Sequence, residues 1–127
     1  MLSYINTQAY TDTNLVEAYV LFSSSNDETI VQTCTQPVSL GVFEQVVGDV
    51  NINGVKFIHS TGNGAAAGNF YEQTIYRTTQ GGFCYEIVFV VHSFNRGSLL
   101  PQTVIAEYDR AALLAKFEAI LSTLIIK

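Results

Sequence analysis

Charged residues are scarce in this sequence, and basic residues are scarcest. Of the 127 residues 13% are charged, whereas an ordinary soluble domain carries about 25%. Six Lys and Arg residues stand against eleven Asp and Glu residues, which gives a net charge of −5, and the basic residues form no run. Nucleic acids and anionic membrane surfaces are both bound through clustered positive charge. The sequence therefore predicts no nucleic-acid partner and no electrostatic attachment to a membrane.

Long apolar runs are missing as well. A membrane-spanning helix needs roughly 20 consecutive apolar residues, and the best run here, from Glu86 to Phe94, is short and typical of a strand. The residues after Met1, Leu-Ser-Tyr-Ile-Asn-Thr, have neither the basic start nor the apolar core of a secretory leader. We expect no direct membrane insertion by this segment. Two locations stay open, namely the cytoplasm and an extracytoplasmic compartment reached with a leader that this sequence lacks.

Motifs for metals, cofactors and nucleophilic catalysis are also lacking. The two His and two Cys residues show no spacing that would chelate a metal locally. The glycine-rich segment 62–68 superficially resembles a phosphate-binding loop, but such a loop opens a helix. Here the following residues have the pattern of a strand, so we expect a flexible loop. Cys84 and His92 lie eight residues apart on one strand, roughly 26 Å, which excludes a catalytic dyad. We expect no cofactor, no metal and no catalytic residue, and we expect His59 to be a half-buried core residue.

Aromatic and β-branched residues supply the apolar excess, which favours strands over helices. Alternation predicts a strand over residues 15–22. The residues at even positions of this strand share one face, are all apolar and should lie in the core: Val16, Ala18, Val20 and Phe22. The segment 83–94 is largely apolar on both faces, which is typical of a central strand that is covered on both sides.

Two turn signals predict hairpins. Asn53-Gly54 provides the two positive-φ residues of a type I′ turn, which pairs Ile52 with Val55 and Val50 with Phe57. A turn at Gly81-Gly82 joins residues 69–79 to residues 83–94. The resulting register places three pairs of residues opposite each other: Arg77 and Glu86, Ile75 and Val88, and Tyr71 and His92.

Two segments have helical spacing. A short helix is predicted after Asp27 as N-cap, and Pro37 should end it. Near the end of the chain, Asp109 should cap a longer helix with one apolar stripe: Leu113, Phe117, Ile120, Leu121 and Leu124. That stripe needs a sheet to pack against. The fold class is therefore α+β, a mostly antiparallel sheet of about five or six strands closed by an amphipathic C-terminal helix. Residues 1–127 are expected to form a single domain.

A group of polar residues on the predicted sheet is the first place to look for a site. The register puts Arg77, Glu86, Tyr71 and His92 on one sheet face, with Glu72 across the strand. Our leading interpretation is a buried ion pair between Arg77 and Glu86, because buried charge is costly unless it is paired. The alternative is a ligand-binding or acid–base role with His92 as the titratable group. In that reading a pocket between sheet and helix is lined by aromatic residues and His92: Tyr71, Tyr76, Phe89 and His92.

The two cysteines, Cys34 and Cys84, have no alternative partner of their own kind in the chain. Both lie near the ends of predicted elements, where a loop is easily joined to a sheet. We predict a disulfide between them, which would place the domain in an oxidising compartment. The alternative is two independent buried thiols. A pairing of Cys34 with His59 or His92 is geometrically open.

Several blocks of sequence resemble an uncharacterised bacterial domain. The blocks are Thr13-Asn14-Leu15-Val16-Glu17-Ala18, Ala67-Gly68-Asn69-Phe70-Tyr71, Tyr76-Arg77-Thr78, Cys84-Tyr85-Glu86-Ile87, Val91-His92-Ser93 and Glu107-Tyr108-Asp109-Arg110. That domain typically occurs in lipid-anchored or membrane-anchored extracytoplasmic proteins, and the resemblance runs from about Tyr4 to the end of the chain. The order of elements is more loosely similar to the PsbP/Mog1-type α/β/α sandwich, a likeness of fold that implies no function. The resemblance implies an extracytoplasmic location, although the leader or anchor of those proteins is missing here.

These observations lead to one functional expectation and one alternative. The expectation is a non-enzymatic extracytoplasmic domain, binding or structural, with a protein or small-molecule partner in the cell envelope. The alternative is a small-molecule-binding or hydrolytic domain with a pocket between the sheet and the C-terminal helix. A cleft that reached His92 and Glu86 together would favour the alternative.

Overall fold

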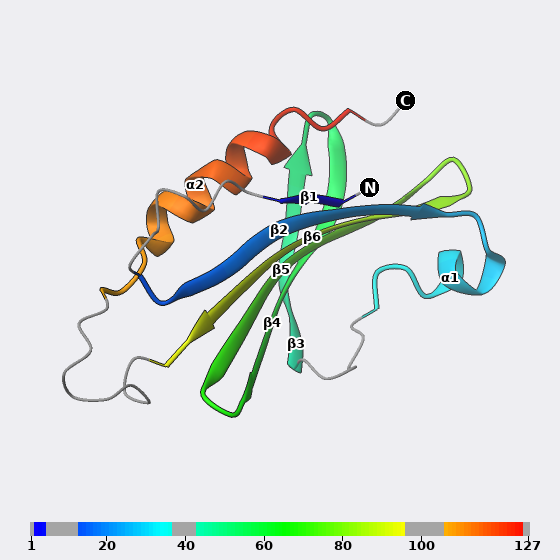
Figure 1. The fold of residues 1–127 in the computed structure, drawn as a ribbon. Coiled ribbons are helices and arrows are strands. Elements are labelled where there is room, and N and C mark those ends of the chain that lie inside the picture. The colour runs from blue at the N-terminus through cyan, green and yellow to red at the C-terminus, as the bar shows by residue number, and fades with distance from the viewer. Residues whose placement is uncertain (1, 5–12, 37–42, 96–105, 126–127) are drawn as a thin grey trace.

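One antiparallel sheet organises the chain (Figure 1). The computed structural model describes residues 2–4, 13–36, 43–95 and 106–125. The elements in chain order are β1 (Leu2–Tyr4), β2 (Leu15–Ser25), α1 (Glu28–Gln32), β3 (Phe43–Ile52), β4 (Val55–Ala66), β5 (Asn69–Gln80), β6 (Phe83–Phe94) and α2 (Arg110–Leu121). The strand order is β1-β2-β6-β5-β4-β3. The predicted α+β class with a mostly antiparallel sheet and a C-terminal helix is confirmed.

Both predicted hairpins are present with the predicted registers. Asn53 and Gly54 have φ values of 51° and 85° and join β3 to β4, with Ile52 opposite Val55. Gly81 and Gly82, also at positive φ, join β5 to β6, and this turn sets Arg77 opposite Glu86. Positive φ costs glycine little, which is why these two dipeptides fix the registers of the long strands.

A third hairpin replaces the flexible loop that the glycine-rich segment was expected to form. Residues 62–66 belong to β4 and pair with β5 over their whole length. The turn is Ala67-Gly68, and Ala67 has a φ of 52°. A non-glycine residue rarely takes this conformation, so the dipeptide gives no clear turn signal in the sequence. The loop prediction was wrong because the pairing of small residues on β4 with β5 is not visible locally.

An irregularity at the start of β2 corrects the predicted core face. The pairing of β2 with β6 shifts between Leu15 and Glu17, which marks a bulge. A bulge turns the residues before it to the other face. Val16 is accordingly 47% exposed, whereas Ala18 and Val20 are buried and Leu15 packs against the core.

The main core lies between the sheet and α2, which runs along one side of the sheet in Figure 1. The helix contributes Leu113, Phe117 and Leu121, all buried. Phe117 stacks on Phe89 with ring centroids 4.5 Å apart. Of the rest of the predicted stripe, Ile120 is 41% exposed and Leu124 lies beyond the helix end and is partly buried. The predicted N-cap is confirmed, because the Asp109 side chain accepts a hydrogen bond from the backbone N–H of Ala112.

A smaller apolar cluster lies on the opposite face of the sheet. It consists of Ile75, Val88 and Val90, with Tyr19 packed against it. Since Ile87, Phe89 and Val91 on the other face of β6 are buried as well, β6 is buried on both faces. The prediction of a central, doubly covered strand is confirmed.

The short helix α1 follows Asp27, whose carboxylate accepts hydrogen bonds from the backbone N–H groups of Thr29 and Ile30. It ends at Gln32, and Pro37, the predicted stop, lies outside the described residues. In Figure 1, α1 lies beside the end of the sheet that carries the β5–β6 turn. Within the described ranges no helix is long and apolar enough to cross a membrane.

Candidate functional site

The predicted site residues do not share one pocket. Side chains alternate along a strand, so Tyr71 and Arg77 lie on one face of β5 and Tyr76 on the other. Tyr71 pairs with His92 and Arg77 with Glu86, all four on the face opposite α2. Tyr76 and Phe89 instead contact Phe117 of α2. The prediction of one pocket lined by Tyr71, Tyr76, Phe89 and His92 is therefore wrong, because these residues lie on two faces of the sheet.

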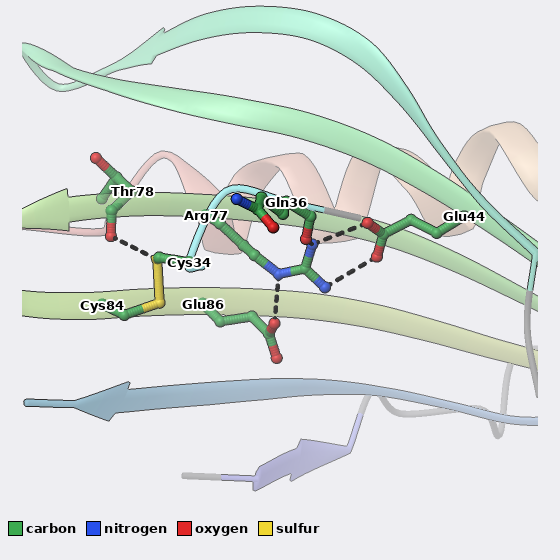
Figure 2. A network of polar contacts seen from close by, with 7 residues as sticks. All are labelled: Cys34, Gln36, Glu44, Arg77, Thr78, Cys84 and Glu86. Atoms are coloured by element: carbon green, nitrogen blue, oxygen red, sulfur yellow. Dashed lines mark hydrogen bonds and ion pairs between the residues drawn. A yellow bond between two sulfur atoms is a disulfide. The ribbon is translucent and has the colours of Figure 1, made fainter. Parts of the chain in front are cut away.

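The predicted cross-strand ion pair is present and belongs to a larger network (Figure 2). Arg77 Nε donates to Glu86 Oε2 at 2.6 Å. Its two terminal nitrogens donate to the two carboxylate oxygens of Glu44 of β3, both at 2.9 Å. Arg77 Nη1 also donates to the backbone oxygen of Gln36 at 3.4 Å. The guanidinium thus has charge-assisted bonds in a forked geometry, which are stronger than neutral ones.

Sequence reasoning missed Glu44, which is the more buried of the two carboxylates. Its side chain is 3% exposed, against 33% for Glu86. The register explains how Arg77 reaches it: the residues of β4 on this face near Glu44 are Ser60 and Gly62, and Glu44 pairs with Gly62. Because these residues are small, a long side chain from β5 can pass over β4 to β3.

The electrostatics of the network favour a charged guanidinium. Burial alone would lower the pKa of Arg77, but the hydrogen bonds and charges of Glu44 and Glu86 raise it above its ordinary value. Two carboxylates surround one cation, and all the nitrogens of Arg77 have acceptors. The hydrogen bonds to Glu86, Glu44 and Gln36 occupy four of the five N–H groups of the guanidinium, and such a network stabilises one arrangement of the sheet face.

A disulfide joins Cys34 to Cys84, as predicted, with Cα atoms 5.6 Å apart. Both residues are buried, and Cys34 Sγ lies 3.4 Å from the backbone oxygen of Thr78. The alternatives of two free thiols, or of Cys34 with a histidine, are wrong. Figure 2 shows the disulfide beside the Arg77 network, with the chain around Gln36 passing over the guanidinium. The disulfide therefore holds the segment after α1 on this face of the sheet.

His92 is the centre of a second polar group, at the other end of the same face. Its Nε2 lies 2.9 Å from Asn69 Oδ1, and its Nδ1 lies 3.7 Å from Glu17 Oε1. The Tyr71 ring stacks on the imidazole with centroids 4.4 Å apart. The buried side chains of Val88 and Val90 come between Glu86 and His92 on this face of β6. The two polar groups are therefore separate, and packed side chains fill the space between them.

Glu72 faces α2 and is held there. Arg110, the first residue of α2, donates from Nε to Glu72 Oε2 at 3.0 Å. Nearby, the buried Asn14 joins three segments: its Nδ2 donates to Phe94 O and to Glu107 Oε1, and its Oδ1 accepts from the N–H of Tyr108. These contacts fix the segment before α2 against the start of β2 and the end of β6.

His59 is half-buried on the α2 face, as predicted. Its ring stacks on Tyr76 with centroids 4.6 Å apart and an interplanar angle of 7°. Nε2 is buried and has no hydrogen-bond partner among the described residues. Burial lowers the pKa of His59, because an imidazolium would lose its hydration there. The imidazole ring packs against Tyr76.

The hollows lined by described residues include the following three. One of about 320 Å³, almost wholly apolar, lies between β2 and the end of α2, and includes Phe22, Ile120 and Leu124. A second lies at the β4–β5 hairpin. The third, about 330 Å³, lies between the β3–β4 hairpin and α2 and includes Tyr76 and Glu118. None of these three is lined by both His92 and Glu86. No group of three or more His, Cys, Asp or Glu residues that could hold a metal ion occurs in the described part of the chain.

Comparisons with protein-family models, with curated proteins and with solved structures found no match for this chain.

Proposed function

We propose that this chain is a non-enzymatic binding or structural domain of an extracytoplasmic, oxidising compartment. The observation that carries the proposal is the buried Cys34–Cys84 disulfide. Disulfides persist in secreted and periplasmic proteins and are rare in the reducing cytosol. The resemblance to an anchored extracytoplasmic bacterial domain, and the looser likeness to the PsbP/Mog1-type sandwich, agree with this location and are part of the proposal.

The pairing of the polar side chains supports the non-enzymatic part. A catalytic group needs access to a substrate atom, whereas Arg77 is bound by two carboxylates and a backbone oxygen. His92 has Asn69 and Glu17 as neighbours and a tyrosine ring on its face. Both polar groups have the features of structural networks.

The location is tested by producing the full chain twice, once in a bacterial cytosol and once exported to the periplasm. Each sample is alkylated under denaturing, non-reducing conditions and weighed by mass spectrometry. We expect no alkylated cysteine in the periplasmic sample and lower resistance to urea in the cytosolic one. Two alkylated thiols in fresh periplasmic protein would refute the proposal.

The alternative, a small-molecule-binding or hydrolytic domain, keeps one supporting observation. The hollow between the β3–β4 hairpin and α2 is lined by Tyr76, one of the residues named for it. A screen of ester substrates with the parent protein and with Tyr76→Phe, which removes the hydroxyl group at that hollow, separates the hydrolytic form from the binding form. Turnover that disappears in Tyr76→Phe would favour hydrolysis over our proposal.

A further inference from the structure

The hollow between the β3–β4 hairpin and α2 combines an apolar floor with polar groups. Its lining residues come from the hairpin, from β5 and from the end of α2: Val50, Asn51, Ile52, Asn53, Tyr76, Glu118, Leu121 and Ser122. Ile52, Tyr76 and Leu121 are at most 9% exposed. Buried apolar walls with a few polar groups at the rim are typical of small-ligand sites.

Two polar groups at this hollow have no hydrogen-bond or ion-pair partner among the described residues. Within the described ranges no ion pair or hydrogen bond engages the Glu118 carboxylate, and none engages the Tyr76 hydroxyl. Both residues line the same hollow, and burial and then the charge of Glu118 raise the pKa of Tyr76. Neither the Glu118 carboxylate nor the Tyr76 hydroxyl has a positively charged donor beside it among the residues that line the hollow.

The surroundings add to the preference for a cation. None of the eight lining residues is basic. Lys56 pairs with Asp49 at 3.2 Å, and the alternation along the hairpin puts both on the face away from Val50 and Ile52. Leu121 and Ser122 mark the C-terminal end of α2, where the helix dipole is negative. The net charge of the chain, −5, has the same effect at long range.

We infer that this hollow binds an alkylammonium group, with the ammonium at Glu118 and the Tyr76 hydroxyl and the alkyl stem against Val50, Ile52 and Leu121. A primary ammonium offers three donors, which suits two separate oxygen acceptors. A divalent metal ion fits less well, because Ca²⁺ takes six to eight oxygen ligands and only one carboxylate lines the hollow. The inference rests on the proposed binding role and names its ligand class.

Binding is tested by NMR titration of the ¹⁵N-labelled full chain with n-butylammonium chloride, with n-butanol as an uncharged probe of similar shape. We expect saturable shifts at Asn51, Asn53 and Ser122 with butylammonium and none with butanol. Glu118→Gln should weaken binding about tenfold, since it removes a charge-assisted hydrogen bond. Tyr76→Phe should weaken it less, because the ring that packs on His59 and Phe117 is kept.

Glu28→Gln is the matched control. It removes the same charge from an exposed position in the first turn of α1, so it should leave the affinity unchanged. Equal weakening by Glu28→Gln and Glu118→Gln, equal shifts with butanol, or no saturable shift at millimolar butylammonium would overturn the inference. None of these results would affect the alkylation test of the disulfide, so the two proposals fail separately.

The same titration distinguishes two sources of the ligand. The probes are 1,4-diaminobutane, a free polyamine, and acetyl-Ala-Lys-Ala-amide, which presents a lysine side chain. Tighter binding of the peptide would support a protein partner, and tighter binding of the diamine would support a small molecule. Either order of affinity supports the alkylammonium site, provided that Glu118→Gln weakens the binding of both probes.

Discussion

At the scale of single residues, Arg77 has the largest electrostatic role. It is 7% exposed and neutralises two carboxylates, one of them almost completely buried. Removing one partner of a buried charge network costs more than the pair itself contributes, because the remaining charge loses its compensation. The side chain also fills space between β5 and β3, so its volume matters separately from its charge.

This reasoning predicts the order of three variants in urea unfolding. Arg77→Ala should destabilise the protein by about 3 to 5 kcal/mol, and Arg77→Met should cost less because methionine refills the volume while Glu44 and Glu86 stay unpaired. Arg110→Met is the control, since its ion pair with Glu72 is exposed and should contribute at most about 1 kcal/mol. Arg77→Met and Arg110→Met variants with equal midpoints would contradict the buried network.

His59 gives a prediction about pH. Burial lowers its pKa in the folded state below the ordinary value of 6.5, so in acid the unfolded chain binds a proton before the folded chain does. The contribution of the neutral His59 to the free energy of unfolding is then fully present above about pH 6.5 and is lost as the pH falls below it. His59→Phe keeps an aromatic ring on Tyr76 and removes the titration. Thermal unfolding between pH 7 and pH 5.5 should show a smaller loss of stability for His59→Phe than for the parent. The same slope in both proteins would exclude His59 as its cause.

At the scale of elements, the turn between β3 and β4 also caps α2. Asn53 Nδ2 donates to the backbone oxygens of Ser122 and Leu124, at 3.0 Å and 2.6 Å. The same residue takes a positive φ in the turn. One asparagine thus fixes the hairpin register and provides a donor for carbonyl groups beyond the helix end, which otherwise lack intrahelical partners.

Two substitutions separate these roles of Asn53. Asn53→Gly keeps the turn conformation and removes the amide donor, so it should cost about 1 kcal/mol. Asn53→Asp replaces the donor with a carboxylate at the negative end of the helix dipole, so it should cost more. Chemical denaturation of both variants tests the order. If Asn53→Asp is as stable as the parent, the contact with α2 contributes nothing.

The packing of α2 is tested by a pair of truncations on one helix. Phe117 is 1% exposed and contacts Tyr76 and Phe89, whereas Ile120 is 41% exposed. Phe117→Ala should destabilise the protein by about 3 to 5 kcal/mol through lost burial and the cavity it leaves. Ile120→Ala should cost well under half as much. Equal urea midpoints for Phe117→Ala and the parent would mean that α2 does not pack as described.

The accuracy of the sequence predictions follows from how local each signal is. Asn53-Gly54 and Gly81-Gly82 fix two registers because their conformations are nearly forced, and with them the Arg77–Glu86 pair. Ala67-Gly68 gives no such signal, so the β4–β5 pairing was missed. Glu44 was missed because nothing local marks β3 as a strand beyond its end at the Asn-Gly turn. The predicted pocket that combined Tyr71 with Tyr76 was an avoidable error. The two residues are an odd number of positions apart on one strand, so their side chains must lie on opposite faces of the sheet.

At the scale of the whole molecule, the two layers of the fold are held in different ways. The α2 side buries a large apolar cluster, from Ala18 on β2 to Leu121 on the helix. The opposite side has only three buried residues in its apolar cluster, and α1 buries none of its own residues. A disulfide at Cys34 and a hydrogen bond from Arg77 to the backbone oxygen of Gln36 therefore hold the segment after α1 in place.

The disulfide should accordingly contribute much of the stability of this side. Closing a loop with a sequence separation of 50 residues stabilises a fold by about 4 kcal/mol on the chain-entropy model, an upper figure because strain in the folded state subtracts from it. The Cys34→Ser/Cys84→Ser variant should unfold at lower urea, and the parent should match it in the presence of a reductant. Hydrogen exchange should then show that residues 28–36 lose protection before the strands do, because the core between the sheet and α2 does not depend on the disulfide. If the double variant and the reduced parent unfold at the midpoint of the oxidised protein, the disulfide contributes no stability. The argument that ties this fold to an oxidising compartment would then lose its physical basis.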